Sequence, residues 1–309
     1  MQTPRIKIAV VGYGNVGRCA VEAVLTEPDM DLAGVIEVPD VVSKQYAPAA
    51  RDPLAPRGIR FASEISELGG VDVAILSCPS RIIRDAAGRL LAAGIRTVDG
   101  FDIHAEIPAL RRYLGDLARL HNTVSILAAG WDPGIDSVIR GWFQAMAPRG
   151  ITYTNYGPGM SMGHSVAVRA ISGVKDGLSI TVPTGMGIHR RMVYVELHPG
   201  VDFEEVERAI KADHYFVKDL TYVYQVDDVS ALMDTGHGVL LERNGMSGTT
   251  HNQSMKFQLK VNNPALTAQV MVSAARAATR QKPGCYTMIE LPVVDFLYGE
   301  VDAFVTKFV

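Results

Sequence analysis

The first 130 residues alternate short apolar runs with longer amphipathic stretches. Because strands buried on both faces are almost continuously apolar, this pattern indicates parallel strands joined by helices. The predicted strands are residues 6–12, 30–36, 71–77, 96–100 and 123–129. The predicted helices are residues 15–26, 82–93 and 106–121. Residues 40–60, rich in Pro, Ala and Arg, are expected to form a loop or an irregular crossover.

The pattern changes after about residue 150, where Thr, Tyr and Val alternate with polar residues. A period of two is typical of antiparallel strands with one exposed face. Such strands are predicted at 151–156, 178–183, 192–197, 220–226 and 255–261, with helices at 204–212 and 264–282. The predicted fold class is therefore α/β, with an N-terminal Rossmann domain (1–150, completed by part of 264–309) and a mixed α+β domain (151–263).

The bulk composition excludes several classes of protein. A chain of 309 residues with 48% hydrophobic and 20% charged residues suits two ordinary globular domains. A net charge of −3 gives no basic footprint for nucleic acid, and no apolar run is long enough to cross a membrane or to serve as a signal peptide. The three scattered cysteines show no metal-ligand spacing, so we expect no metal site and a reducing, cytoplasmic setting.

A glycine-rich motif stands between the first predicted strand and the first helix: Gly12-Tyr13-Gly14-Asn15-Val16-Gly17. In this context GxGxxG indicates a dinucleotide site, with Gly12 in the tight turn, Gly14 beside the pyrophosphate and Gly17 against the strand. The helix N-terminus then offers N–H groups to the phosphates.

Glu37 ends the second predicted strand, where an acidic side chain accepts hydrogen bonds from the adenosine ribose. A carboxylate there repels the 2′-phosphate of NADP, so the residues favour NAD. Arg51, Arg57 and Arg60 in the following loop keep a phosphate site, and hence NADP, as the alternative. Further along, Cys78-Pro79-Ser80 follows a central strand and is expected to border the nicotinamide ribose, with Cys78 interpreted as a packing residue.

Polar side chains follow the later strands of the first domain. One group is Asp99-Gly100-Phe101-Asp102, and the other is Gly130-Trp131-Asp132-Pro133-Gly134. Carboxylates and a tryptophan at the mouth of a Rossmann crevice suit a cationic amine, because buried carboxylates need a cationic or hydrogen-bonding partner. The second domain adds a glycine-rich turn at 157–164 that ends at His164.

Taken in order, the segments VVGYGNVGR, VDGFDIH, GWDPG, GPGMSMGHS, HRRMVYV and NNPALTA resemble meso-diaminopimelate dehydrogenase over nearly the whole chain. The pair GWDPG and GPGMSMGHS is far more specific than GxGxxG. The GMSMGH segment is similar to the thermophile-type subgroup, some members of which accept other D-amino acids. The resemblance implies NAD(P)-dependent oxidative deamination of the D-centre of meso-2,6-diaminopimelate, as well as the reverse reductive amination of lysine biosynthesis.

The resemblance also implies the roles of individual residues. Asp102, Trp131 and Asp132 would surround the D-amino centre, and Met162 and Gly163 would border it. The distal L-amino acid end would be held by Thr181, Arg191, His237 and Asn263. Asp102, and after it Asp132, are the candidates for the general base, with a water between them as a further possibility. The family forms homodimers through its second domain. Its usual NADP-binding arginines are replaced here by Glu37-Val38-Pro39.

Two other hypotheses remain. Another Rossmann amino-acid oxidoreductase, of the diaminopentanoate or homoserine dehydrogenase kind, shares the cofactor fold but should lack GWDPG with GPGMSMGHS. A non-catalytic NAD-sensing protein on the same scaffold is the second, because a fold alone does not prove activity.

Overall fold

The computed structural model describes residues 4–37, 58–232 and 236–309. The chain forms two compact units, one of Met1–Val138 with Pro264–Val309 and the other of Ile139–Asn263. The second unit is thus inserted in the sequence of the first. The units divide within α6 (Ile135–Met146), earlier than the boundary expected at residue 150.

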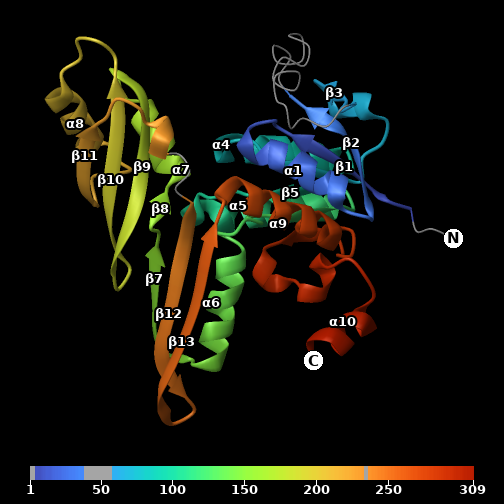
Figure 1. Cartoon of the computed structure of the whole chain (residues 1–309). Helices are drawn as coiled ribbons and strands as arrows, with labels where there is room; N and C mark the ends of the chain where they lie inside the picture. The colour runs from blue at the N-terminus through green and yellow to red at the C-terminus, as the bar shows by residue number, and fades with distance from the viewer. Residues whose placement is uncertain (1–3, 38–57, 233–235) are drawn as a thin grey trace. The chain divides into compact units, whose positions relative to one another are not determined.

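The first unit is built on a seven-stranded parallel sheet of order β14-β6-β5-β4-β1-β2-β3. Of its strands, β1, β2, β3 and β5 are labelled in Figure 1. Its strands are β1 (Ile6–Val11), β2 (Met30–Ile36), β3 (Phe61–Ala62), β4 (Val73–Leu76), β5 (Arg96–Asp99), β6 (Val124–Ile126) and β14 (Gly284–Tyr286). The chain winds outward from β1 through β2 and β3, then returns to β4 and winds the other way. The switch between β1 and β4 is the place where such sheets bind ligands, at the carboxyl ends of the strands.

Helices cover both faces of this sheet, which explains its continuously apolar strands. Ile75 of β4 is buried in one cluster with Val24 and Ala275, whereas the adjacent Leu76 is buried in another with Leu114. The helices are α1 (Asn15–Thr26), α4 (Ser80–Ala92), α5 (Ile107–Leu120), α9 (Asn263–Ala278) and α10 (Val301–Phe308). Short 3-10 turns lie at Ile65–Leu68, His104–Glu106, Met288–Glu290 and Val293–Phe296. Helices α1 and α9 therefore pack on one face, and α4 and α5 on the other.

The C-terminal segment completes the first unit. β14 pairs with β6 as an edge strand of the sheet. Arg276 of α9 is only 3% exposed and forms ion pairs of 2.6 Å with Glu27 and with Asp29, which lie between α1 and β2. A buried guanidinium with two carboxylate partners joins the last part of the chain firmly to the first.

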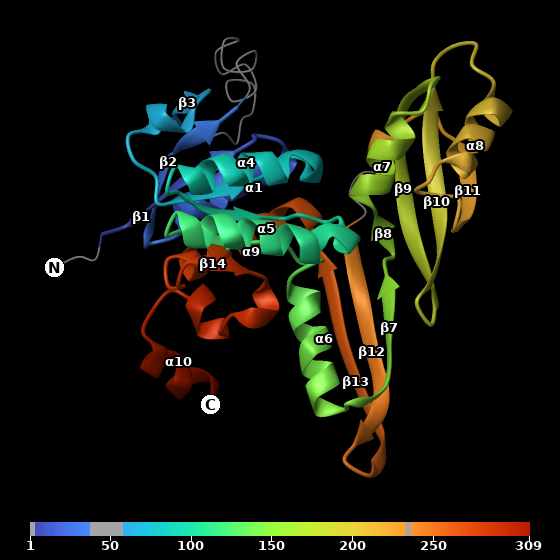
Figure 2. The ribbon, with the colours of Figure 1, turned by 180° about the vertical axis from the view of Figure 1, so that it is seen from behind.

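The second unit contains two sheets, of order β11-β10-β9-β8 and β13-β12-β7 (Figure 2). Its strands are β7 (Arg149–Tyr156), β8 (Gly159–Met160), β9 (Val174–Gly185), β10 (Ile188–Leu197), β11 (Leu220–Gln225), β12 (His237–Ser247) and β13 (Thr250–Val261). Apart from the parallel pair β10 and β11, the pairings are antiparallel. The helices are α7 (Met162–Arg169) and α8 (Phe203–Ala212), with a 3-10 turn at Ser230–Leu232. α7 and α8 pack on the four-stranded sheet around Val168, Val193, Ile210 and Phe216.

The predicted fold class is confirmed, namely a parallel Rossmann-type sheet followed by a separate, largely antiparallel unit. The sequence missed β12 because its first residues are buried on both faces and do not alternate. It also missed α6, α7 and α10. The predicted turn at 157–164 in fact contains β8 and the first residues of α7, so His164 lies on a helix. Most of the loop predicted at 40–60, with Arg51 and Arg57, lies outside the described residues.

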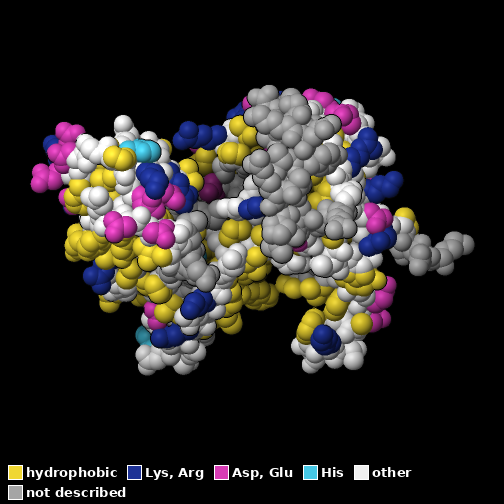
Figure 3. All heavy atoms as spheres, turned by 45° about the horizontal axis from the view of Figure 1, so that its top comes forward, with side chains coloured by type: hydrophobic (Ala, Val, Ile, Leu, Met, Phe, Trp, Pro, Cys, Tyr) yellow, Lys and Arg dark blue, Asp and Glu magenta, His cyan; other side chains and the backbone are white. Residues whose placement is uncertain are grey.

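None of the described helices has the length and apolarity that a membrane span requires. The cysteines Cys19, Cys78 and Cys285 are all free thiols. On the face that Figure 3 shows, acidic and basic side chains are interspersed, in keeping with the small net charge.

Candidate active site

The glycine-rich turn connects β1 to α1 at the switch point of the sheet. Gly12 has a φ of +92°, and a Cβ on it would lie 2.8 Å from the carbonyl oxygen of Ser77. A Cβ on Gly17 would lie 2.0 Å from the oxygen of Gly12, whereas one on Gly14 would meet nothing within 4 Å. Two glycines are therefore required by close packing, and Gly14 leaves open space at the start of the helix. This is the geometry that a pyrophosphate needs.

Glu37 lies directly beside this turn. Its carboxylate accepts a hydrogen bond from the backbone N–H of Tyr13, and its own N–H donates to the oxygen of Ala62 at 3.0 Å. The acid that follows β2 is thus fixed against the glycine motif, the position from which a carboxylate contacts an adenosine ribose. Asn15 and Val16 form the first residues of α1.

The residues that follow β4 lie against the glycine turn between β1 and α1. Ser77 contacts the glycine turn as described, and Pro79 immediately precedes α4, which begins at Ser80. Burial, and secondarily the charge of Asp99, raises the pKa of the Cys78 thiol to about 11. The thiol is therefore protonated near neutral pH, which supports a packing role and argues against a nucleophile.

Asp102 is held at the start of α4. Ser80 donates a hydrogen bond of 2.6 Å from its hydroxyl to Asp102 Oδ1, and the Asp102 N–H donates to the same hydroxyl oxygen at 3.3 Å. The 3-10 turn that follows has Ile103 at its N-cap and no side-chain cap, so Asp102 is not a helix cap. The structure therefore joins a residue predicted for the cofactor with one predicted for catalysis.

Asp99, which the sequence analysis did not select as a site residue, links the two loops that carry the predicted carboxylates. Its Oδ1 accepts hydrogen bonds from the N–H groups of Phe101 at 3.0 Å and Ala128 at 3.1 Å, and its carbonyl oxygen accepts from Ala129 at 2.7 Å. The side chain is completely buried, and this burial raises its pKa to about 6. One buried group thus fixes the backbone before Asp102 and before Trp131.

Trp131 and Asp132 lie in the tight loop between β6 and α6. The Gly130 N–H donates to the oxygen of Pro133 at 3.0 Å, and the Asp132–Pro133 peptide bond is cis. Trp131 is only 4% exposed, and Asp132 is partly buried. Since β6, β5, β4 and β1 are neighbours in a parallel sheet, Asp132, Asp102, Ser80 and the glycine turn all follow strand ends at the same edge.

A second group of predicted residues lies in the second unit, on neighbouring strands. Arg191 of β10 pairs in register with Thr181 of β9, and its NH1 donates to the Thr181 hydroxyl. Its Nε lies 2.6 Å from Asp219 Oδ2. His164 of α7 lies near this group, because the charge of Arg191 contributes, after burial, to lowering its pKa to about 4. His164 is therefore neutral near pH 7, with Nδ1 2.9 Å from the Ser161 hydroxyl.

The remaining predicted residues lie around the short strand β8. Gly159 pairs with Thr181, and a Cβ on Gly159 would lie 2.6 Å from the Cα of His237. His237 pairs with Val261, two residues before Asn263, which begins α9. Gly163 is exposed in the first turn of α7, and the side chain of Met162 lies outside what the structure describes. The structure thus brings Thr181, Arg191, His237 and Asn263 into one region of this unit.

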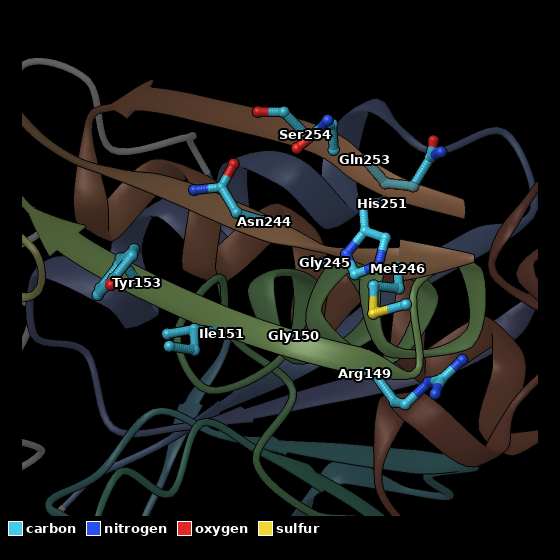
Figure 4. A pocket seen from close by; sticks show the side chains of 11 residues that line it. Arg149, Gly150, Ile151, Tyr153, Asn244, Gly245, Met246, His251, Gln253 and Ser254 are labelled. Atoms are coloured by element: carbon cyan, nitrogen blue, oxygen red, sulfur yellow. The ribbon is translucent and has the colours of Figure 1, made fainter. Parts of the chain in front are cut away.

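A separate hollow of about 660 Å³ lies over β7, β12 and β13 (Figure 4). Arg149, Tyr153, Asn244 and His251 are among the residues that line it. None of the residues predicted for cofactor or substrate is among its described lining residues, so this hollow is distinct from the candidate site.

Known proteins match the chain along nearly its whole length. Residues 130–188, which hold GWDPG and the segment at 157–164, match the diaminopimelic acid dehydrogenase C-terminal domain. The meso-diaminopimelate D-dehydrogenase of Bacteroides fragilis is 55% identical over 296 residues, 96% of each chain. The chain belongs to the meso-diaminopimelate D-dehydrogenase family.

Solved structures of this family agree with the fold. The structure of C. glutamicum DAP dehydrogenase in complex with DAP matches with a TM-score of 0.85 and 27% identity, over 99% of this chain and all of that one. An engineered D-amino acid dehydrogenase bound to NADP+ matches with a TM-score of 0.80 and 26% identity, over 99% and 100% of the two chains. The family resemblance stated from the motifs is therefore confirmed.

Proposed function

We propose that this chain catalyses the NAD-dependent oxidative deamination of the D-centre of meso-2,6-diaminopimelate. The nicotinamide, when bound, would accept the hydride from the substrate Cα, and hydrolysis of the resulting imine would give L-2-amino-6-oxopimelate, ammonium, a proton and the reduced cofactor. The observation that carries the proposal is the hydrogen bond from Ser80 to Asp102, since it holds a carboxylate at the start of α4, at the edge of the sheet where the glycine turn also lies. Family membership and the homologue names support the same reaction.

The carboxylates of the first unit perform the proton chemistry. An ammonium must lose a proton before its Cα can release a hydride, and a carboxylate within hydrogen-bond reach accepts it. Asp102 is exposed and oriented by Ser80, so it takes the role of base, with Asp132 helping to bind the ammonium. Trp131, buried in the same loop, presents an apolar wall to this centre.

The second unit binds the distal end of the substrate. Arg191 binds the distal carboxylate, because a guanidinium binds carboxylates in a planar, two-pronged arrangement. Thr181, His237 and Asn263 contribute polar contacts from the same region. The family resemblance implies that Met162 and Gly163 border the D-centre. The two ends of a diamino dicarboxylate thus find separate groups of residues.

The position of Glu37 supports NAD as the preferred cofactor. Its carboxylate lies against the Tyr13 N–H at the turn that would receive the pyrophosphate, close to where the ribose of the adenosine binds. A 2′-phosphate at this place meets a negative charge. The engineered relative is bound to NADP+, so the proposed preference for NAD rests on Glu37 of this chain.

The deciding experiment is the initial rate of cofactor reduction with meso-diaminopimelate, with NAD and NADP in parallel and with D-alanine, L-alanine and D-lysine as comparisons. Turnover of meso-diaminopimelate with NAD is expected, and Asp102→Asn should reduce kcat by about 100-fold or more if it is the base. Comparable rates on simple D-amino acids would indicate a broad D-amino acid dehydrogenase. Cofactor binding without amine-dependent reduction would overturn the proposal in favour of an NAD sensor.

We also propose that the chain forms a homodimer through its second unit. The hollow over β7, β12 and β13 has Ile151, 59% exposed, among its lining residues, and a second copy would cover it. Analytical ultracentrifugation should show a dimer, and Ile151→Asp should shift it toward monomer. A monomeric wild type at micromolar concentration would contradict this.

A further inference from the structure

Arg191 is held on two sides and open on the third. Its Nε forms an ion pair of 2.6 Å with Asp219 Oδ2, and its NH1 donates to the Thr181 hydroxyl. Among the described residues, NH2 has no hydrogen-bond partner, although the Arg191 side chain is only 14% exposed. A guanidinium has five N–H donors in a fixed plane, so this arrangement leaves NH2 and the second N–H of NH1, here called the free edge, for an external acceptor.

Asp219 is itself rigidly placed. It immediately precedes β11, whose Thr221 pairs in register with Arg191 of β10. Its N–H donates to the oxygen of Phe216 at 3.0 Å, and its carbonyl oxygen accepts from the Thr221 hydroxyl at 3.1 Å. The carboxylate is 26% exposed in its side chain and reaches Arg191 from a fixed backbone position. The orientation of the guanidinium is therefore determined by the end of a strand rather than by a mobile loop.

Two opposing effects follow from this ion pair. The negative charge of Asp219 repels a second carboxylate that approaches Arg191, which weakens binding. It also removes most of the rotational freedom of a long side chain before substrate arrives, which strengthens binding. The orientation effect dominates here, because Asp219 engages Nε and Thr181 engages NH1, which leaves NH2 to the incoming carboxylate.

We propose that Asp219 is a positioning residue for substrate specificity, which aligns the free edge of Arg191 with the distal carboxylate of a diamino dicarboxylate. This rests on the proposed function of the chain. Asp219 acts on binding of the distal end alone, because its described polar contacts join it to Arg191, Phe216 and Thr221 and not to the residues of the D-centre.

The test compares steady-state kinetics of wild type, Asp219→Ala and Asp219→Asn on meso-diaminopimelate and on D-lysine, which lacks the distal carboxylate. Asp219→Ala should raise KM for meso-diaminopimelate about 10-fold or more, from the loss of a hydrogen bond to a charged group, with kcat nearly unchanged. Asp219→Asn keeps an acceptor for Nε, so its KM should lie between those of wild type and Asp219→Ala. Asp227→Ala, at an exposed acid after β11, is the control for net charge and should behave as wild type.

Each outcome separates the possibilities. A parallel loss of kcat on both substrates in the two Asp219 variants would show a merely structural role and overturn the proposal, as would an unchanged KM in Asp219→Ala. If D-lysine is not turned over, the split between KM and kcat on meso-diaminopimelate decides. If Asp219→Ala does not fold, Asp219→Asn must still raise KM more than Asp227→Ala does. A wild type with no turnover of meso-diaminopimelate would refute the proposed function itself, and with it this role for Asp219.

Discussion

The completely buried carboxyl group of Asp99 makes the stability of the first unit depend on pH in a predictable direction. Its pKa is about 6 in the folded chain, against an ordinary value of 3.8, because burial disfavours the charged form. A carboxyl whose folded pKa is raised contributes stability that is fully present below pH 4 and is lost as the pH rises through 6. We expect Asp99→Asn, which cannot ionise, to abolish this loss.

The magnitude follows from the size of the shift. The pKa of Asp99 rises from 3.8 to about 6 on folding. At about 1.4 kcal/mol per pKa unit, this shift changes the free energy of unfolding by roughly 3 kcal/mol in total. About 2 kcal/mol of that change falls between pH 4.5 and 7.5. In the variant, the asparagine oxygen still accepts from Phe101 and Ala128, and its NH2 replaces Oδ2, which has no hydrogen-bond partner among the described residues. Replacing the carboxyl by an amide therefore changes the free energy of unfolding by an amount that does not depend on pH.

The assay is urea unfolding at pH 4.5, 6 and 7.5, followed by tryptophan fluorescence. In a Trp142→Phe background, the remaining tryptophan is Trp131, which is buried in the first unit. The difference in unfolding free energy between Asp99→Asn and the parent should move by about 2 kcal/mol in favour of the variant as the pH rises. Thr97→Val, a buried change two residues earlier on β5, should show a constant difference. A pH-independent difference for Asp99→Asn would refute the reasoning.

Three further predictions concern the cofactor side of the site. Glu37→Arg should shift the ratio of kcat/KM for NADP over NAD upward by about 10-fold or more, because a repulsive charge becomes attractive; an unchanged ratio would remove Glu37 from cofactor selection. Ser80→Ala should lower kcat with meso-diaminopimelate by about 3- to 10-fold through the loss of the Asp102 hydrogen bond, whereas a rate equal to wild type would show that Asp102 needs no support. Because the pKa of Cys78 is about 11, its alkylation by iodoacetamide, followed by mass spectrometry, should remain slow at pH 8 and accelerate above pH 10; rapid labelling at pH 7 would contradict this protonation state.

Local patterns predicted the structure around the glycine motif well. The order of strand, glycine turn and helix at Gly12–Gly17 is read directly from adjacent residues, and Glu37 is located by its distance along the chain from that turn. Likewise, the apolar runs of β1, β2 and β4 are continuous because both faces of the sheet are covered. These features depend on neighbours in sequence, so one sequence is enough to find them.

Features that depend on partners distant in the sequence could not be predicted from the local pattern of hydrophobic and polar residues. Asp99 owes its role to the N–H of Ala128, 29 residues later, and Asp219 to Arg191, 28 residues earlier. An aspartate at the end of a buried strand is the one signal that pointed toward Asp99. The strand β12, which pairs with β7 and β13 on its two edges, was missed because its first residues are buried in succession and so lack the alternation expected of an antiparallel strand. Tertiary pairing, rather than local propensity, decides these positions.

The return of the C-terminal segment to the first unit affects the order in which the protein is made. Strands β1 to β6 leave the ribosome long before α9 and β14, and the whole second unit is translated between them. Until α9 emerges, the apolar face that it covers stays open and Glu27 and Asp29 lack their buried arginine. The domain that would bind the nucleotide is therefore the last to be completed during synthesis, although it begins first. A chain truncated before α9 would be an aggregation-prone fragment and not a free-standing nucleotide-binding domain.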